Sequence, residues 1–258
     1  MENRENPLVS VIMPAYNAER FIARSIESAL NQTVQEIELI VIDDCSSDNT
    51  CRIAEEYAAG DTRVTVLRNE QNMGVARTRN RGFDVCRGAY VALLDSDDIW
   101  YPAKLEKQLA LIQKEQADIA YCSYALVNEQ GEKKCDDFIV PTSTDFEEML
   151  GSNMIGCSTV MLTSEIARQH RFSDRGYHED YVLWLHLLKQ GKKAVGLSET
   201  LVDYRVYSGS KASNKLKSAK FRWQIYRDIL KLSRAASAWY FTRYAVAGVA
   251  KYWGRVCK

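Results

Sequence analysis

Carboxylates cluster directly after a short apolar stretch in the first half of the chain. Residues 95–98 read Asp-Ser-Asp-Asp and follow the run Tyr90–Leu94. Such a cluster is a poor core element, because unpaired charges are costly to bury. Hard divalent ions, by contrast, bind carboxylate oxygens together with substrate phosphates. The cluster therefore predicts a metal and phosphate site; the alternative is a polar turn in which Asp98 caps the next helix.

A second acidic pair, Asp43 and Asp44, follows the apolar run Leu39–Ile42. The first apolar run ends in Pro-Ala-Tyr-Asn, so Tyr16 offers an aromatic face near the same place. An aromatic ring can stack on a nucleobase, and a carboxylate can accept a base N–H or a ribose hydroxyl. Because the ends of parallel strands meet at one edge of a sheet, these residues predict a nucleoside pocket.

The third feature is the pair Glu179 and Asp180, which precedes the amphipathic stretch Val182–Leu188. Acids are favoured in the first turn of a helix by its macrodipole, so the pair alone is a weak signal. A carboxylate held there is also a reasonable general base. His178 and His186 have a simpler interpretation as capping or packed imidazoles, which we prefer for His186.

These residues need a scaffold, and the pattern predicts an α/β fold. Short β-rich runs alternate with helical patterns, which indicates βαβ units and a parallel sheet covered on both faces. In the first half we expect strands at 8–13, 37–42, 63–67 and 90–94 and helices at 20–31, 48–59 and 75–86, with Ser47 or Asp48 capping the second helix. In the less regular second half we expect helices at 102–113 and 179–189 and strands at 118–127, 158–162, 193–197 and 201–206.

Composition narrows the functional classes. The 258 residues carry no net charge, but residues 215–258 hold eleven Lys or Arg and one acid, so this tail is +10 and the rest is −10. An acidic body argues against nucleic acid as a partner. The seven cysteines show no CxxC pair and are expected to be reduced thiols in a cytosolic protein. The polar residues 1–7 predict no signal peptide, and no 18-residue run lacks charge, so no membrane span is expected.

Four stretches resemble, in order and spacing, the bacterial family 2 glycosyltransferases with the GT-A fold, over about residues 8–210. They read VSVIMPAYNAERFIARSIESALNQT, ELIVIDDCSSDNT, NMGVARTRNRGFDVCRGAYVALLDSDDIWYPAKLEKQ and HEDYVLWLHLL. The resemblance implies a GT-A catalytic domain over 1–210, Rossmann-like with a mixed, mainly parallel sheet. Its nucleotide-binding half would span about 1–100 and its acceptor half about 101–210. Enzymes of this kind act in O-antigen, capsule or other surface polysaccharide assembly.

The resemblance also implies roles for single residues. Pro14, Tyr16 and Asp44 would line the nucleoside pocket, and Asp95 and Asp97 would form the DXD motif. Asp97 would bind Mn²⁺ or Mg²⁺ directly, with Asp95 beside it facing the ribose or sugar. Asp180, of the Glu179–Asp180 pair, would be the catalytic base.

One departure from the family pattern stands after the last expected strand. Similar proteins often read Tyr-Arg-x-His there, and that histidine can face the metal or the diphosphate. Here the stretch is Tyr204-Arg205-Val206-Tyr207. Either the metal keeps fewer protein ligands or Tyr207 contributes its phenol, and Arg205 is a candidate to bind the diphosphate.

The implied reaction is an inverting transfer from a nucleotide sugar, most simply a UDP-hexose, to a hydroxyl of a saccharide acceptor. A polyprenyl-diphosphate-linked acceptor and a β-glycosidic product are expected, with the enzyme on the cytoplasmic face of the bacterial inner membrane. The alternatives are a non-catalytic nucleotide-sugar-binding protein and a sugar nucleotidyltransferase. A dinucleotide-dependent oxidoreductase would need a glycine-rich first turn, where this chain has Pro14-Ala15-Tyr16-Asn17.

The tail, residues 211–258, is predicted to be a helical extension in which nine aromatic residues are interleaved with the basic ones. Aromatic belts and snorkelling cations are typical of a helix that lies in the headgroup layer of an anionic membrane. The alternative is a helical pair packed on the catalytic domain or on a second subunit in a homo-oligomer.

Overall fold

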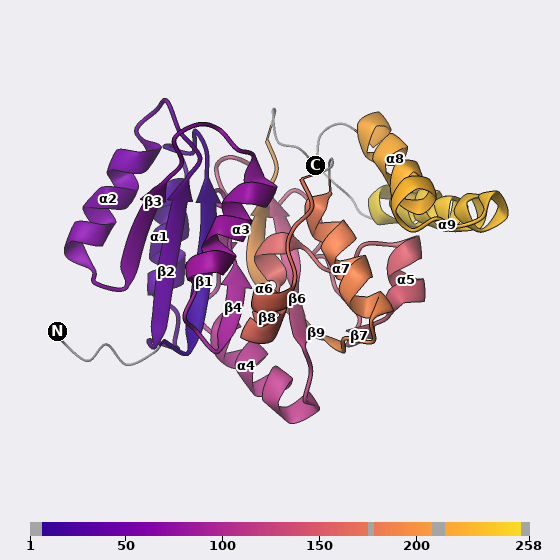
Figure 1. The fold of residues 1–258 in the computed structure, drawn as a ribbon, viewed down its shortest axis with the longest axis horizontal. Helices are drawn as coiled ribbons and strands as arrows, with labels where there is room; N and C mark the ends of the chain where they lie inside the picture. Colours follow the sequence, from indigo (N-terminus) through magenta and orange to yellow (C-terminus); the bar gives the residue numbers. More distant parts are fainter. Residues whose placement is uncertain (1–6, 175–177, 208–214, 254–258) are drawn as a thin grey trace.

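The computed structural model describes residues 7–174, 178–207 and 215–253. Within them, nine strands form one sheet, with the order β3-β2-β1-β4-β8-β6-β9-β5 and β7 paired to β9 (Figure 1). The strands are β1 Val9–Ala15, β2 Ile37–Asp43, β3 Val64–Arg68, β4 Tyr90–Leu93, β5 Ile99–Trp100, β6 Ile119–Val127, β7 Ser143–Thr144, β8 Met161–Thr163 and β9 Ala194–Arg205.

The first four strands are parallel to one another, which brings their carboxyl ends to one edge. Ala15 at the end of β1 pairs with Asp43 at the end of β2, and Ile12 pairs with Leu93 of β4. β8 joins the sheet antiparallel between β4 and β6, and β6 then pairs in parallel with β9. The fold class expected from the sequence is therefore confirmed.

Helices cover both faces of this sheet. They are α1 Ile22–Leu30, α2 Thr50–Gly60, α3 Val75–Val85, α4 Lys104–Glu115, α5 Phe146–Gly151, α6 Ser164–Gln169, α7 Glu179–Lys189, α8 Lys215–Gln224 and α9 Arg234–Trp253. Successive side chains of a strand point to opposite faces, and β1 follows this rule. Val11 and Met13 pack with α1 and α4, whereas Ile12 packs with α3, α6 and α7. The apolar runs of the parallel strands are continuous because both faces are buried.

Several local predictions were wrong. Residues 193–206 form one strand, β9, instead of two. In place of the strand expected at 158–162, a 3₁₀ turn at Cys157–Thr159 precedes β8. The alternative considered for Asp98, a cap on the next helix, is also wrong, because β5 follows it and α4 begins only at Lys104. Asp48 is one residue from the cap position of α2, which is Asn49, although its carboxylate accepts the Thr50 N–H at 2.9 Å.

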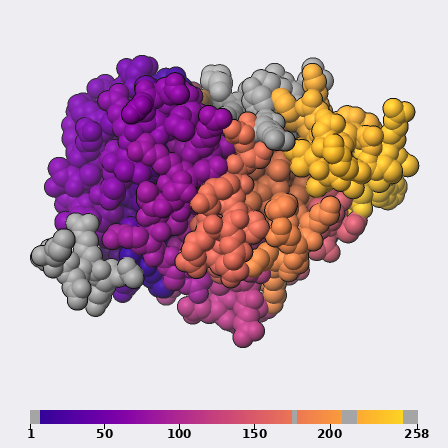
Figure 2. Space-filling model, in the orientation of Figure 1, coloured from indigo at the N-terminus to yellow at the C-terminus, as the bar shows by residue number. Residues whose placement is uncertain are grey.

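The tail forms a helical pair that packs on the α/β part of the chain. α8 continues through the π-helical segment Ile225–Ile229 and α9 then contacts α5 (Figure 1). The buried Tyr226 hydroxyl donates to the Leu150 carbonyl, and the Tyr240 hydroxyl donates to the Glu147 carboxylate. Figure 2 shows the pair as a lobe at one end of the molecule. Among the described helices, none is both long and apolar enough to span a membrane.

Candidate active site

The turn after β1 is tied to the loop after β2 by side-chain to backbone hydrogen bonds. Asn17 adopts a left-handed conformation with φ 49°. Its N–H donates to Ser46 Oγ at 3.0 Å, and its Oδ1 accepts the Ser47 N–H at 2.9 Å. Tyr16 is thereby held at the sheet edge with 51% of its surface exposed. Pro14 lies beside it inside β1, so both residues predicted for the nucleoside pocket reach this edge.

Asp44 is buried and anchors the loop that leads into α3. Its carboxylate accepts the N–H groups of Met73 and Gly74, both at 2.8 Å, and the Asn69 amide at 2.7 Å. Gly74 has φ 82°, a conformation that side-chain-bearing residues rarely adopt. Asp44 thus lies at the predicted pocket, and its oxygens fix the backbone of a neighbouring loop. Its contact with a nucleoside stays a prediction.

The carboxylates after β4 diverge in their surroundings. The Asp95 N–H donates to Ser158 Oγ at 3.0 Å, which fixes the start of the loop. Burial raises the pKa of Asp97 to about 6 and the Asp95 charge adds to this, while a hydrogen bond with Tyr207 opposes it. Tyr207, at the position where similar proteins carry histidine, stacks at a tilt on Phe21 with ring centroids 5.3 Å apart. The tyrosine phenol therefore reaches the DXD motif itself.

Arg205 is buried, and its guanidinium donates hydrogen bonds to the loop that contains Asp97. Its Nε donates to the Asp97 carbonyl at 2.8 Å, and its Nη1 donates to the carbonyls of Asn128 and Glu129 at 2.8 and 2.9 Å. Its backbone N–H donates to Asp98 Oδ1 at 2.8 Å. Burial raises the pKa of Asp98 well above its ordinary value, and the charges of its acidic neighbours add to the shift. Arg205 therefore shapes the DXD loop, and its contact with a diphosphate stays a prediction.

The acidic pair at 179–180 lies where the sequence predicts, at the start of α7. His178 precedes the helix in a left-handed conformation, with φ 67°. Burial raises the pKa of Asp180 to about 6, and the Glu179 charge adds to the shift, whereas Arg79 and the Tyr181 backbone oppose it. A carboxylate with a pKa near the working pH is suited to accept a proton during catalysis.

Arg79 is a site residue that our reading of the sequence missed. It is 3% exposed, and its Nη2 lies 2.6 Å from Asp95 Oδ1 while its Nη1 lies 2.7 Å from Glu179 Oε1. One buried guanidinium thus joins the DXD motif to the helix of the predicted base. The signal was available: Ala76, Arg79 and Phe83 share one face of the helical pattern, so an arginine falls on its buried side.

His186 lies two turns along α7 from this pair. Its Nε2 is 2.7 Å from the Gln190 amide, and its ring meets His170 edge-on at 5.8 Å. His186 is exposed, so the packed imidazole that the sequence suggests is met only by an edge contact with one ring on the surface.

The donor set suits a hard divalent cation that shares its coordination with a substrate. Among the described residues, no group of three or more His, Cys, Asp and Glu side chains is arranged to hold a metal alone. Mg²⁺ and similar ions are commonly bound by one or two carboxylates together with substrate phosphates. Burial, and after it the Asp95 charge, raises the pKa of Asp97, and a bound cation would oppose both effects. Asp97 and Asp95 therefore fit such an ion, with the remaining ligands from a diphosphate and water.

A mixed, mainly parallel sheet whose carboxyl edge carries Tyr16, Asp44, the sequence Asp95-Ser96-Asp97 and the helix start at Glu179 agrees with the GT-A resemblance of the sequence. The model of glycosyl transferase family 2 matches residues 10–162. The chain belongs to this family.

Two relatives match over nearly their whole length. The putative teichuronic acid biosynthesis glycosyltransferase TuaG of Bacillus subtilis is 39% identical over 95% of this chain and 97% of that protein. WfgD of Escherichia coli, a UDP-Glc:alpha-D-GlcNAc-diphosphoundecaprenol beta-1,3-glucosyltransferase, is 36% identical over 95% of each chain.

A solved structure agrees in fold. Staphylococcus aureus TarS 1–349, in complex with UDP-GlcNAc, superposes with a TM-score of 0.74 at 21% identity, over 95% of this chain and 73% of that one. At this identity the likeness establishes the GT-A fold alone.

Proposed function

We propose that this glycosyltransferase moves a hexose from a UDP-sugar to a hydroxyl of a polyprenyl-diphosphate-linked saccharide, with inversion at the anomeric carbon. The acceptor class is supported by WfgD, whose name gives a diphosphoundecaprenol-linked acceptor. The observation that carries the proposal is the Arg79 bridge, which holds the DXD carboxylate Asp95 and the base helix together at one sheet edge. Donor and acceptor would therefore meet between Asp95 and Asp180.

The reaction is a single displacement. Asp180 takes the proton of the acceptor hydroxyl as that oxygen forms a bond to the anomeric carbon. The bond from that carbon to the diphosphate oxygen breaks on the opposite face, and the nucleoside diphosphate leaves. An α-linked donor would give a β-glycoside. Asp97 and Asp95 would hold Mn²⁺ or Mg²⁺, which supplies Lewis-acid neutralisation of the leaving diphosphate.

Arg79 acts in this scheme as a positioning residue. Two charge-assisted hydrogen bonds fix its planar guanidinium between Asp95 and Glu179. The same positive charge opposes the upward shift of the Asp180 pKa. Arg79 would thus set both the distance between donor and base and the pH at which the base is ionised.

The tail would keep the enzyme at the cytoplasmic face of an anionic membrane. Exposed cations such as Lys231 and Arg234 support this placement, since each basic group near an anionic surface contributes about 1 kcal/mol. Full-length protein should co-sediment with anionic liposomes at low salt, and the double variant Lys231→Glu, Arg234→Glu should bind them more weakly. The matched control is the double variant Arg52→Glu, Lys114→Glu, which reverses two exposed charges outside the tail. Equal losses in both variants would contradict the proposal.

The transferase activity is tested by a panel of nucleotide sugars, with Mn²⁺ and a saccharide on polyprenyl diphosphate, scored by release of free nucleoside diphosphate. Acceptor-dependent release from a UDP-hexose supports the proposal, and the anomeric proton coupling in the product reports its configuration. Binding of the donor without turnover would identify a non-catalytic binding protein. Release of pyrophosphate from a sugar phosphate and UTP would identify a nucleotidyltransferase.

A further inference from the structure

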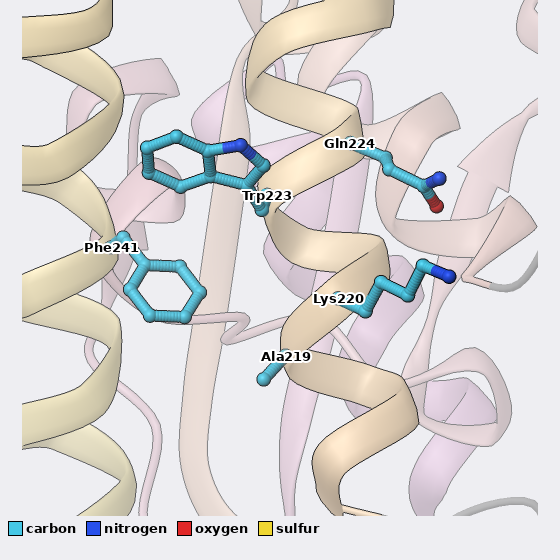
Figure 3. A pocket seen from close by; sticks show the side chains of 5 residues that line it. All are labelled: Ala219, Lys220, Trp223, Gln224 and Phe241. Atoms are coloured by element: carbon cyan, nitrogen blue, oxygen red, sulfur yellow. The ribbon is translucent and has the colours of Figure 1, made fainter.

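A groove between α8 and α9 lies outside the catalytic edge. It has a volume of about 590 Å³, within the usual range of ligand sites, about 300–1,000 Å³. Figure 3 shows its lining, with Phe241 projecting from α9 toward Trp223 on α8. The two rings meet edge to face, with centroids 5.7 Å apart and an interplanar angle of 84°. The lining residues are Ala219, Lys220, Trp223, Gln224 and Phe241.

The helices around this groove carry much of the apolar side-chain surface that the protein leaves in water. Among the described residues, four of the eight exposed large hydrophobic side chains belong to this segment: Trp223, Ile229, Trp239 and Val246. Large apolar side chains left exposed and concentrated in one segment are a feature of interaction surfaces. Residues 218–248 also hold six Lys or Arg and one acid, a net charge of +5. The surface therefore suits an amphiphile with an apolar chain and an anionic head.

The groove adjoins the predicted base through the opposite face of α8. Arg222 is buried and its guanidinium lies 3.6 Å from the ring centroid of Tyr181, the residue after Asp180. Phe221 meets the His178 ring edge-on at 6.5 Å, at the start of the base helix. Both residues lie between Lys220 and Trp223 in the sequence. One turn of α8 therefore lines the groove on one side and contacts the start of the helix of Asp180 on the other.

We propose that the α8–α9 groove binds the isoprenoid chain of the lipid-linked acceptor. This rests on the proposed acceptor class and adds the surface that recognises its lipid. The aromatic rings of Trp223 and Phe241 would contact the hydrocarbon, and the exposed ammonium of Lys220 lies in the same lining, where it complements the diphosphate that joins chain to sugar. The saccharide would then extend past the start of α7 toward Asp180.

The test compares one acceptor saccharide on a long polyprenyl diphosphate and on a ten-carbon prenyl diphosphate, both in detergent. Trp223→Ser should raise the KM for the long-chain acceptor about tenfold, because the indole contact with the chain is lost. The KM for the short-chain acceptor should change much less, and kcat for either acceptor little. Ile139→Ser is the control, since this side chain is 56% exposed and lies outside the helical pair, and it should leave both KM values unchanged.

Other occupants give different results. Equal KM changes for both acceptors, or none, would overturn the proposal. So would loss of self-association by Trp223→Ser in sedimentation velocity, which would show that a second copy covers the groove. Weaker binding of acceptor-free liposomes with an unchanged KM would show contact with the bilayer itself. If the unsubstituted protein transfers to neither acceptor, the proposed function fails; if it transfers to both without a chain-length preference, only the groove assignment fails.

Discussion

The sheet edge proposed as the active site and the α8–α9 pair both hold charged side chains away from water, but the two regions stabilise those charges by different contacts. At the edge, Arg79 is the buried cation shared by Asp95 and Glu179, and the pKa values of Asp97 and Asp180 stay raised, to about 6 each. In the helical pair, the buried Arg222 lies over two aromatic rings, 3.6 Å from the centroid of Tyr181 and 4.7 Å from that of Tyr244.

These different surroundings distinguish a ligand-binding site from a structural packing contact. Asp97 and Asp180 are carboxylates whose pKa values are raised first by burial and then by neighbouring acids, so they favour a cation or a proton from a ligand. A cation stacked on rings keeps its charge, and its planar group contributes packing. Substitutions that change charge at the sheet edge are therefore expected to change the transfer rate, whereas substitution of Arg222 in the helical pair should change the stability of the fold.

The largest effect is expected at Asp97. Asp97→Ala removes the carboxylate that the proposal assigns to the metal, so transfer should fall to near background, and EDTA should do the same to the unsubstituted enzyme. Turnover with Mn²⁺ and circular dichroism are the measurements. Asp84→Ala, an exposed carboxylate on α3, is the control and should remain active. Full activity in EDTA would refute the metal assignment.

Asp180→Asn should lower the transfer rate by about 10²–10⁴-fold, the usual contribution of a general base. Donor affinity should stay within a few-fold, because the base meets the acceptor. The folded state should not lose stability at pH 7.5: a raised pKa means that ionised Asp180 disfavours folding above about pH 6, and the neutral amide removes that cost. Glu179→Gln should lower the rate less than Asp180→Asn does. A larger loss of rate in Glu179→Gln would show that Glu179 is the base.

Arg79→Lys keeps the charge but loses the planar fork that reaches two carboxylates, and we expect a fall in kcat of about 10–100-fold, typical when a residue that orients catalytic groups is changed. Arg79→Ala should also cost about 1.5–3 kcal/mol of stability, since it removes two charge-assisted hydrogen bonds from a buried guanidinium to the partly buried Asp95 and Glu179. Thermal melts separate the two effects. The acid limb of kcat/KM should move to higher pH in Arg79→Ala, because the cation that lowers the Asp180 pKa is gone. An unmoved limb with lower stability would assign Arg79 a purely structural role.

Much of the fold could be predicted from the sequence because its signals are local. Alternating β-rich and helical runs gave β1 to β4 and α1 to α3 within about two residues. β9 was divided in the prediction because Ser198, Glu199 and Thr200 look like a turn. In the structure the strand stays paired with β6, with a register shift in which Cys122 faces Leu197 and Ser123 faces Thr200. A bulge of this kind depends on the partner strand, which local patterns do not show.

The site was predictable in its residue types and less so in its contacts. The alternative role for Asp98 was a helix cap, but its carboxylate accepts the Arg205 N–H, a partner 107 residues away. The tail was predicted to be helical, and it is, but amphipathic periodicity is the same for a helix facing lipid and one facing protein. The buried Tyr226 and Arg222 show that one face of the pair packs on the domain, which leaves the other face for the groove.

The smallest effect expected is a shift in the pH dependence of the rate. This shift distinguishes Asp97 from Asp180, the two carboxylates whose pKa values are raised. The rate should fall tenfold per pH unit below about pH 6, because the base works only when ionised. The groups that face Asp180 are Glu179 on its own helix, Arg79 on α3, Asp95 after β4 and the Cys157 thiol. Glu179→Gln removes the like charge that raises the Asp180 pKa and leaves Arg79 with one acidic partner fewer, so both changes move the acid limb of kcat/KM to lower pH. Glu179 is paired with Arg79 and is not among the groups that shift the pKa of Asp97. If the acid limb of kcat/KM does not move in Glu179→Gln, the limb reports Asp97, and Asp180 is not the group that limits the rate in acid.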